Sequence, residues 1–442
     1  MKRSSIILGM TAAAVIAGCT EREEILPGTR EDPRAILSGG VPADALAADV
    51  AREASTVRLP KAVQNNAWTQ SSGTPKTRVL HASLSAAPQL VWSADIGAGD
   101  GRRNRITADP VVADGRIFTL DSEARVSATG TNGAAIWSRD LTPSRDKSGE
   151  ATGGGLAVAG GTLYVTSGFG LLTALDAATG EEVWQQDLGS TGSGAPTVFG
   201  DLVYVLGGDD TGWALERDTG RIRWQTSQSG DVNNVLGAPA PAVNDRFAIF
   251  AFGDGALHGT FRNGGLRMWT AFVAGQRRSS ALAKVNDVTA GPVISGDRVY
   301  VGSHSGRLLA LDLDTGNRVW TAREGAISPV LVVGGSVFAV SDENELIRLD
   351  ARDGVKIWSK KLPDLLKLKQ RKASEVYAHY GPILAGGQLI VASNDGVLRF
   401  FDPTTGEMTR SVEVPGGATT APVVAGGTLY VVGTKGQLHA FR

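Results

Sequence analysis

The sequence predicts an all-β protein, an eight-bladed β-propeller made of four-stranded antiparallel blades. Two observations carry this prediction. Units of about 40 to 50 residues, the usual period of propeller blades, repeat along the chain and end in Gly-x-x-x-Trp. The 57 glycines separate short runs rich in Val, Leu, Thr and Tyr, which favours short strands joined by tight turns. A chain of 442 residues with 42% hydrophobic content can bury the large core that such a ring needs.

The first residues have the layout of a secretion signal. Lys2 and Arg3 give a positive start, and Ile6 to Ala17 form an apolar stretch shorter than the roughly 18 residues of a membrane-spanning helix. The stretch ends in Val15-Ile16-Ala17-Gly18-Cys19, which resembles the lipobox of bacterial lipoproteins. That resemblance implies cleavage before Cys19 and acylation of this residue, palmitate included. The alternative is ordinary signal cleavage with an incidental cysteine.

The residue after the cysteine bears on location. In bacterial lipoproteins an Asp there signals inner-membrane retention, whereas this chain has Thr20. The resemblance therefore implies lipid anchoring at the outer membrane, on its periplasmic face. Because Cys19 is the only cysteine, a disulfide within the chain is excluded.

Between the signal and the repeats lies a segment without sustained strand alternation. Pro27, Pro33 and Pro42 stand there among mixed charges and alanines, a composition typical of flexible linkers. We therefore expect a lipoprotein signal peptide over residues 1–18, a flexible tether over 19–66 and the propeller over 67–442.

Each repeat has the same internal order. A Pro-Val-Val-type strand, a glycine turn such as Gly160-Gly161, a strand such as Leu-Tyr-Val and a strand such as Leu-x-Ala-Leu-Asp precede the Gly-x-x-x-Trp. Glycine suits a two-residue turn because it adopts positive φ without strain. We expect each tryptophan to pack between neighbouring blades. The six complete copies are Gly133/Trp137, Gly180/Trp184, Gly220/Trp224, Gly265/Trp269, Gly316/Trp320 and Gly354/Trp358.

The two ends of the repeat array predict how the ring closes. A seventh copy keeps Gly406 but has Arg410 in place of the tryptophan, and the last copy stops after its third strand at Arg442. Near the start, the residues ending at Trp92 resemble a fourth strand that has no preceding strands. Pairing that strand with the C-terminal blade removes two exposed edges and gives eight blades.

The search for catalytic groups points away from an enzyme. No zinc-binding spacing appears among the histidines, so we expect no metal. The net charge of −1 does not indicate a nucleic-acid partner. The repeats resemble those of the pyrroloquinoline quinone (PQQ) dehydrogenases over roughly residues 88–442. Those enzymes commonly carry adjacent cysteines over the cofactor, and this chain has none there, so we expect no cofactor. The five histidines are His81, His258, His304, His379 and His439.

Long connections between blades predict a binding surface on one face. The turns between third and fourth strands are short, whereas the interblade connections are long and often basic. Insertions on one face of a repeat array commonly form binding sites, although solvated loops are the alternative for any single one. We expect long connections at Ser93 to Thr107, Ser138 to Thr152, Thr270 to Ala290 and Ser359 to Tyr380.

Signal, lipobox, tether and tryptophan-docked blades together resemble the BamB family, the propeller lipoproteins of the outer-membrane β-barrel assembly (BAM) complex. The resemblance implies a non-catalytic scaffold that is a monomer within the complex. It implies binding to the barrel-forming, BamA-like subunit near its POTRA domains, assistance in folding and inserting outer-membrane β-barrel proteins, and contact with unfolded ones. The alternative is a periplasmic PQQ-dependent dehydrogenase-like quinoprotein.

The resemblance also suggests where the partner binds. Residues 286–292, Asn-Asp-Val-Thr-Ala-Gly-Pro, are similar to an acidic stretch of the family before a blade's proline, so Asp287 is carried over. The preceding connection departs from the family pattern, because Asp231 to Leu236 lacks its Leu-x-Leu-Arg. The expected partner-binding residues are Val235, Leu236, Arg277, Arg278 and Asp287.

Overall fold

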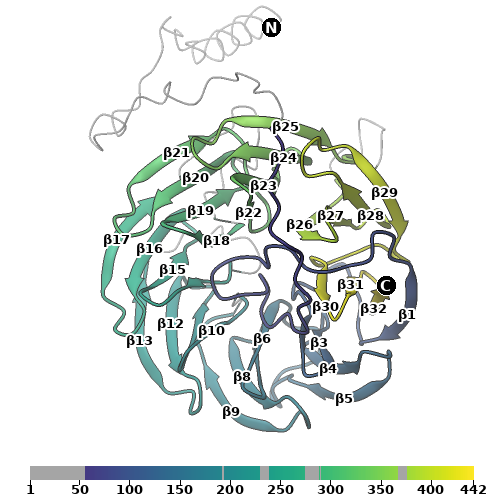
Figure 1. Ribbon diagram of the computed structural model, residues 1–442. Helices are drawn as coiled ribbons and strands as arrows, with labels where there is room; N and C mark the ends of the chain where they lie inside the picture. Colours follow the sequence, from purple (N-terminus) through teal and green to yellow (C-terminus); the bar gives the residue numbers. More distant parts are fainter. Residues whose placement is uncertain (1–54, 192–193, 229–237, 274–287, 289, 367–375) are drawn as a thin grey trace, which may run out of the picture. The chain divides into compact units, whose positions relative to one another are not determined.

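The computed structural model describes residues 55–191, 194–228, 238–273, 288, 290–366 and 376–442. These residues form eight antiparallel sheets of four strands each, arranged as the blades of a ring (Figure 1). The predicted fold class, an all-β eight-bladed propeller, is confirmed. Within these ranges no helix is long and apolar enough to cross a membrane.

The strands follow one another from the axis of the ring to its rim in each blade. Blades 1 to 4 contain β2 (Val111–Ala113), β3 (Arg116–Leu120), β4 (Arg125–Gly130) and β5 (Ala135–Asp140); β6 (Gly154–Ala159), β7 (Thr162–Ser167), β8 (Leu171–Asp176) and β9 (Glu182–Asp187); β10 (Thr197–Phe199), β11 (Leu202–Leu206), β12 (Thr211–Glu216) and β13 (Ile222–Ser227); β14 (Ala242–Val243), β15 (Phe247–Ala251), β16 (Ala256–Phe261) and β17 (Arg267–Phe272).

The second half of the ring repeats this order, and only the last blade takes a strand from elsewhere. Blades 5 to 8 contain β18 (Ala290–Ser295), β19 (Arg298–Ser303), β20 (Arg307–Asp312) and β21 (Arg318–Ala322); β22 (Leu331–Val333), β23 (Ser336–Val340), β24 (Glu345–Asp350) and β25 (Lys356–Lys361); β26 (His379–Ala385), β27 (Gln388–Ser393), β28 (Val397–Phe401) and β29 (Met408–Glu413); β30 (Val423–Ala425), β31 (Thr428–Gly433), β32 (Gln437–Phe441) and β1 (Leu90–Asp95).

The ring closes as the two chain ends predicted. β1 pairs antiparallel with β32, with Trp92 opposite Ala440 and Asp95 opposite Gln437. Two backbone hydrogen bonds between Gln89 and Arg442, at 2.8 and 2.9 Å, extend this pairing to the last residue. The eighth blade is therefore assembled from both ends of the repeat array.

Each docking tryptophan lies over a glycine of the next blade. The indole N–H of Trp269 in blade 4 donates to the backbone carbonyl of Leu313 in blade 5 at 2.9 Å. Its ring covers Gly316, where an added Cβ would lie 2.6 Å from indole Cδ2. Gly316 also has a φ of +69°, so both space and backbone conformation require glycine there. The same pairing joins Trp92 to Gly133, Trp137 to Gly180, Trp184 to Gly220, Trp224 to Gly265, Trp320 to Gly354 and Trp358 to Gly406.

The missing tryptophan at Arg410 has a structural reason. A docking tryptophan needs the turn between the third and fourth strands of the following blade. In blade 8 that turn does not exist, because β32 and β1 come from opposite ends of the repeat array. The interface between blades 7 and 8 therefore offers no receiving glycine at this position.

The hydrophobic core lies between the faces of adjacent blades. Residues of blade 2, such as Tyr164 and Leu172, pack in one cluster with Val203 and Leu215 of blade 3. Clusters of this kind recur around the ring. Burial between blades explains why the sequence shows a repeat rather than one central apolar run.

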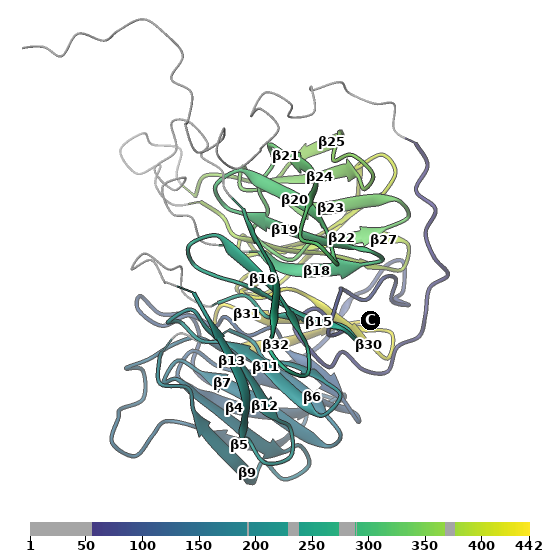
Figure 2. The same cartoon turned by 90° about the vertical axis from the view of Figure 1, so that its left-hand side faces the viewer.

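Residues 55–86, which we call the hub segment, cross the ring at its axis (Figure 1) and lie along one face of it (Figure 2). Val57 is 7% exposed and packs among residues of blades 6 and 7. The Asn65 side chain donates to the carbonyl of Val424 at 2.6 Å. Two residues of the expected tether, Val57 and Asn65, thus contact the blades. The local sequence of this segment shows no strand alternation, so it did not predict contacts with residues this distant in the chain.

Candidate interaction surface

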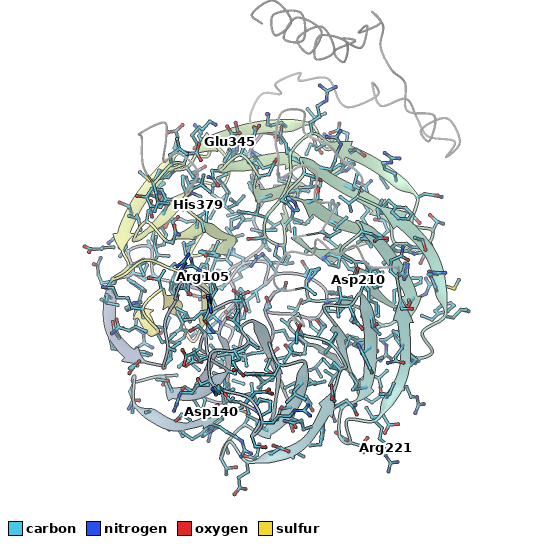
Figure 3. All side chains as sticks on the ribbon, turned by 180° about the vertical axis from the view of Figure 1, so that it is seen from behind. Arg105, Asp140, Asp210, Arg221, Glu345 and His379 are labelled. Atoms are coloured by element: carbon cyan, nitrogen blue, oxygen red, sulfur yellow. The ribbon has the colours of Figure 1, made fainter. Side chains whose placement is uncertain are left out.

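The two faces of the ring carry different connections. Because the four strands of a blade alternate in direction, the turn between second and third strands lies on the same face as the interblade connection. The hub segment lies on the opposite face, where it contacts turns between first and second strands such as Gly386 and Gly426. Figure 3 views the ring from the side opposite to Figure 1, with Arg105 inside the ring of strands and Arg221 at the rim.

The fourth strand of each blade continues further than we expected. Ser138, Thr270 and Ser359 were placed at the start of interblade connections, but they lie within β5, β17 and β25. The same holds for Ser93 in β1. Each fourth strand continues beyond its tryptophan because ladder pairing continues, as between Lys361 and Glu345. The connections are correspondingly shorter than predicted.

The residues expected to bind the partner lie outside the described residues. Val235 and Leu236 belong to the connection before blade 4, and Arg277, Arg278 and Asp287 belong to the one after it. Cys19, the expected lipid anchor, also lies outside them. Both connections nevertheless flank blade 4 in the sequence, and the structure describes the four strands of this blade.

Blade 4 differs from the other blades on its outer strand. Its residues Leu266, Met268 and Phe272 are 64%, 45% and 57% exposed. An apolar residue directly before the docking tryptophan occurs in several blades, such as Val183 and Val319. Phe272, three residues after the tryptophan, has only polar or charged counterparts: Asp95, Asp140, Asp187, Ser227, Arg323, Lys361 and Glu413.

Leu266, three residues before the tryptophan, is also an exception. The counterparts in the other blades are Gln89, Ala134, Glu181, Arg221, Asn317, Val355 and Glu407. No other member of this set is a large, exposed apolar side chain. Blade 4 thus presents exposed apolar side chains near both ends of its outer strand. Exposed apolar clusters on a soluble domain commonly mark interaction sites.

The outer strand of blade 4 also has an unpaired backbone edge. Among the described strands, β17 pairs with β16 and has no neighbour on its other side. Its outward N–H and C=O groups are therefore open to pairing with an extended chain. Most other outer strands carry a charge at the end of the strand, such as Asp140 or Asp187, and charged side chains discourage such pairing.

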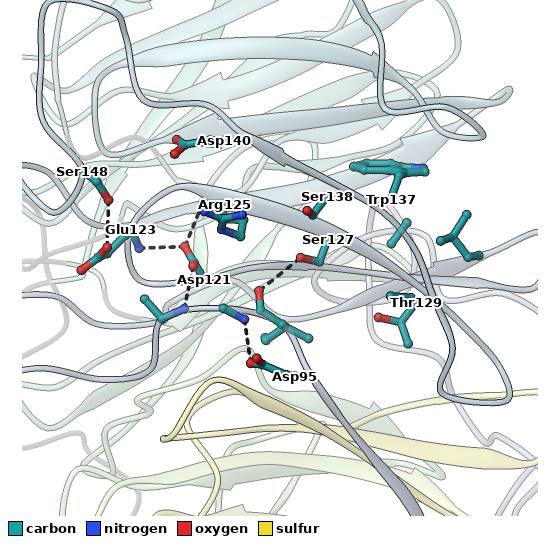
Figure 4. A pocket seen from close by; sticks show the side chains of 16 residues that line it. Asp95, Asp121, Glu123, Arg125, Ser127, Thr129, Trp137, Ser138, Asp140 and Ser148 are labelled. Atoms are coloured by element: carbon teal, nitrogen blue, oxygen red, sulfur yellow. Dashed lines mark hydrogen bonds between the residues drawn. The ribbon is translucent and has the colours of Figure 1, made fainter.

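A groove of about 570 Å³ between blades 8 and 1 gathers four carboxylates, Asp95, Asp121, Glu123 and Asp140 (Figure 4). The Asp121 carboxylate accepts backbone hydrogen bonds from Ala98, Glu123 and Arg125, each at 2.8 Å. Asp95 and Asp140 accept from the backbone two residues further on, at 3.1 and 2.9 Å. Asp95, Asp121 and Asp140 therefore stabilise backbone turns within and next to blade 1.

The electrostatics of the groove agree with this structural role. Burial raises the pKa of Asp121, against the opposing effect of its three hydrogen bonds and of the charge on Arg125. For Asp140, burial acts upward but is outweighed by hydrogen bonds from Thr142 and by Arg125, so its pKa is lowered. The groove has no histidine or cysteine among its lining residues. In the described ranges, no group of three or more His, Cys, Asp or Glu could hold a metal ion.

The histidines are scattered and bound to structural neighbours. His81 contacts the carbonyl of Pro60 at 2.7 Å, and His379 lies 2.6 Å from the Ser393 hydroxyl. His258 lies 3.2 Å from Arg267, and His439 lies 2.8 Å from the Ser93 hydroxyl. His304 occupies the turn between β19 and β20. Four of the five histidines thus contact a carbonyl, a hydroxyl or an arginine of the blades or of the hub segment.

Sequence reasoning missed the outer strand of blade 4. The signal was available, because aligning the repeats on their tryptophans places Phe272 opposite seven polar or charged residues. The repeat pattern reports the positions that the blades share, whereas Leu266 and Phe272 are exceptions to it.

Comparison with known proteins gives one consistent family. A family model described as outer membrane protein assembly factor BamB matches residues 122–360 and 366–442. The curated BamB of Shewanella oneidensis is 27% identical over 373 residues, covering 82% of this chain and 91% of that protein. The BamB of Escherichia coli K12 is 25% identical over 358 residues, covering 80% and 88%.

Solved structures share the fold. BamB from Moraxella catarrhalis has a TM-score of 0.65 at 20% identity, covering 80% of this chain and all of that one. A quinohemoprotein alcohol dehydrogenase from Comamonas testosteroni has a TM-score of 0.63 at 16% identity, covering 86% and 81%. At such identities these two likenesses establish the propeller alone. The match of the family model over most of the repeats shows that this chain belongs to the BamB family of outer membrane protein assembly factors.

Proposed function

We propose that the chain is a non-catalytic scaffold lipoprotein of the outer-membrane β-barrel assembly complex. It is anchored through Cys19 to the periplasmic face of the outer membrane. It binds the barrel-forming, BamA-like subunit near its POTRA domains and assists the folding and insertion of outer-membrane β-barrel proteins. The partner-binding residues are Val235, Leu236, Arg277, Arg278 and Asp287.

The observation that carries this proposal is the character of blade 4. Its outer strand is the one with large exposed apolar side chains on both sides of the tryptophan, Leu266 and Phe272. The two connections that we expect to bind the partner precede and follow this same blade in the sequence. An apolar centre with polar and basic residues around it is the usual composition of a protein interface.

The unpaired edge of β17 supports a second part of the proposal, contact with unfolded barrel proteins. An extended client segment can add a strand to β17 and satisfy backbone groups on both chains. Met268 and Phe272 then give the apolar side chains of the client a surface to cover. Backbone pairing depends little on sequence, which suits a factor that serves many clients.

Site-specific photocrosslinking in cells tests the proposal. A photoreactive residue at Leu236, Arg277 or Asp287 should trap the barrel-forming subunit, and one at Phe272 should trap that subunit or barrel proteins in transit. The matched control is the same residue at Asp187, which occupies the equivalent position of blade 2. Equal yields from Phe272 and Asp187, or no barrel protein from any of the three connection positions, would contradict the proposal.

The anchor has its own test. Replacing Cys19 by serine should release the chain from outer membranes into the soluble periplasm, because acyl chains on this residue supply the membrane affinity. Metabolic labelling with a palmitate analogue should mark the parent chain and leave Cys19→Ser unlabelled. A Cys19→Ser variant that still incorporates the palmitate analogue would show that Cys19 is not the acylated residue.

A further inference from the structure

The hub segment makes hydrogen bonds to every blade of the ring. Its partners lie in, beside or directly before the first strand of each blade, where the backbone groups facing the axis have no neighbour in the sheet. Asn65 bonds to Val424 and Gly426, Trp68 to Val112, Thr69 to Val158, Gln70 to Val198, Pro75 to Val243, Lys76 to Ile294, Arg78 to Pro329 and Ala82 to Leu384.

Several of these contacts are mutual and deeply buried. Trp68 and Val112 exchange two backbone hydrogen bonds, at 2.8 and 2.7 Å. The Gln70 amide donates to the Val198 carbonyl at 2.9 Å and accepts from its N–H at 3.1 Å. Trp68 is 1% exposed and Arg78 is 2% exposed. Buried pairing of this kind resembles the interior of a blade more than a surface loop.

The link from the hub segment to β1 has the opposite character. Ser85, Ala86 and Ala87 are exposed. Their hydrogen bonds include long local contacts at 3.4 Å, such as that from the Ala87 N–H to Ser85 Oγ. β1 is an outer strand held by one neighbour, β32. A pull arriving at its first residue would separate it from β32 one pair at a time.

We propose that the hub segment holds the tether to the propeller through non-covalent contacts alone, so that attachment does not pass through β1. A pull on the tether then meets the hub contacts before it reaches β1, the strand that closes the ring. This inference rests on the proposed lipid anchor only for the origin of the pull. The contacts of the hub segment thus attach the tether to the ring independently of the pairing between β1 and β32.

Cutting the chain between the hub segment and β1 tests this inference. A site-specific protease sequence inserted between Ala86 and Ala87 of the full-length protein allows cleavage after purification in mild detergent. We expect the N-terminal fragment to co-elute with residues 87–442 in size-exclusion chromatography. Separation of the fragments under native conditions would overturn the inference.

Matched tryptophan variants show whether retention depends on the hub contacts. Trp68→Ala should raise the dissociation constant of the cut fragment roughly 100-fold or more, whereas Trp137→Ala, at the interface of blades 1 and 2, should leave it nearly unchanged. Asn65→Ala removes a single side chain's bonds and should raise it about tenfold, which covers the case that Trp68→Ala does not fold. Equal release by Trp137→Ala and the hub variants would overturn the inference.

Failure of the anchor and failure of the hub contacts give different results. Co-elution in detergent depends on the hub contacts and not on acylation. If the anchor proposal is wrong, the uncut protein carries no palmitate label while the cut fragments still co-elute in detergent. If the hub contacts do not hold the tether, the uncut protein carries the label and the cut fragments separate in detergent.

Discussion

The pairing of Trp269 with Gly316 can be tested as a coupled unit. Truncating Trp269 to alanine should destabilise the propeller by about 3 to 5 kcal/mol, because the side chain is 7% exposed and donates to Leu313. Gly316→Ala should also destabilise it. The new Cβ would lie 2.6 Å from the indole, and overpacking of this kind costs about 1 to 3 kcal/mol. The φ of +69° adds about 1 to 2 kcal/mol for a non-glycine residue.

The double variant separates these two terms. With the indole gone, the clash at position 316 disappears and only the conformational term remains. The double variant should therefore be more stable than the sum of the single effects predicts, by about 1 to 3 kcal/mol. Urea unfolding followed by far-ultraviolet circular dichroism measures all four proteins, and an unchanged dependence on urea shows that the same transition is compared. Additivity within about 0.5 kcal/mol would refute the docking geometry.

Four further outcomes are expected. Arg410→Trp should raise the free energy of unfolding by less than about 0.5 kcal/mol, because blade 8 lacks the turn against which a docking tryptophan packs. A clear rise in the urea midpoint would contradict this. Burial, assisted by the charge on Arg267, lowers the pKa of His258 from 6.5 to about 4, so the unfolded chain binds the extra proton between these values. The contribution of His258 to the free energy of unfolding should be fully present above pH 6.5 and decrease towards pH 4. His258→Gln should therefore make the free energy of unfolding less dependent on pH in this range, and an unchanged pH dependence would refute the reasoning. Phe272→Asp should leave the thermal midpoint of unfolding unchanged and should reduce crosslinking of barrel proteins to a photoreactive residue at Arg277 or Asp287. Undiminished crosslinking would exclude a role for the Phe272 side chain. Purified protein mixed with PQQ and Ca²⁺ should show neither quinone absorbance nor dye reduction, and either signal would revive the quinoprotein alternative.

The sequence was sufficient for the ring because its information is periodic. Gly-x-x-x-Trp pairs such as Gly316 and Trp320 report a local turn and an interblade contact together, so each copy supports the others. The incomplete last blade ending at Arg442 predicted closure by the strand at Trp92, since unpaired edges are unfavourable. The lengths of the fourth strands were underestimated because the end of a ladder depends on its neighbour.

The hub segment could not be predicted from local pattern. Its residues have no repeat, and their partners are distant in sequence, as with Gln70 and Val198, which are 128 positions apart. Its backbone groups pair with the inner edges of the first strands of the blades. The repeat pattern already accounts for those strands, so it gives no sign of an additional partner. One sign was present, because Trp68 is a tryptophan outside the Gly-x-x-x-Trp series. A large aromatic residue ahead of the first repeat needs a buried site, and the axis of the ring provides it.

The departures from the repeat explain how a ring of similar blades can bind a partner at one place. A regular ring offers the same outer edge in each blade, and most blades place a charge such as Asp187 or Glu413 at its end. Blade 4 replaces that polar residue by Phe272 and adds Leu266, changes that leave the docking of Trp269 intact. Because docking and exposure fall on different residues of one strand, selection can alter the surface without weakening the ring. The same separation makes Phe272→Asp a sharp test, since the variant restores at this position the polar or charged residue of the other blades and leaves the docking of Trp269 unchanged.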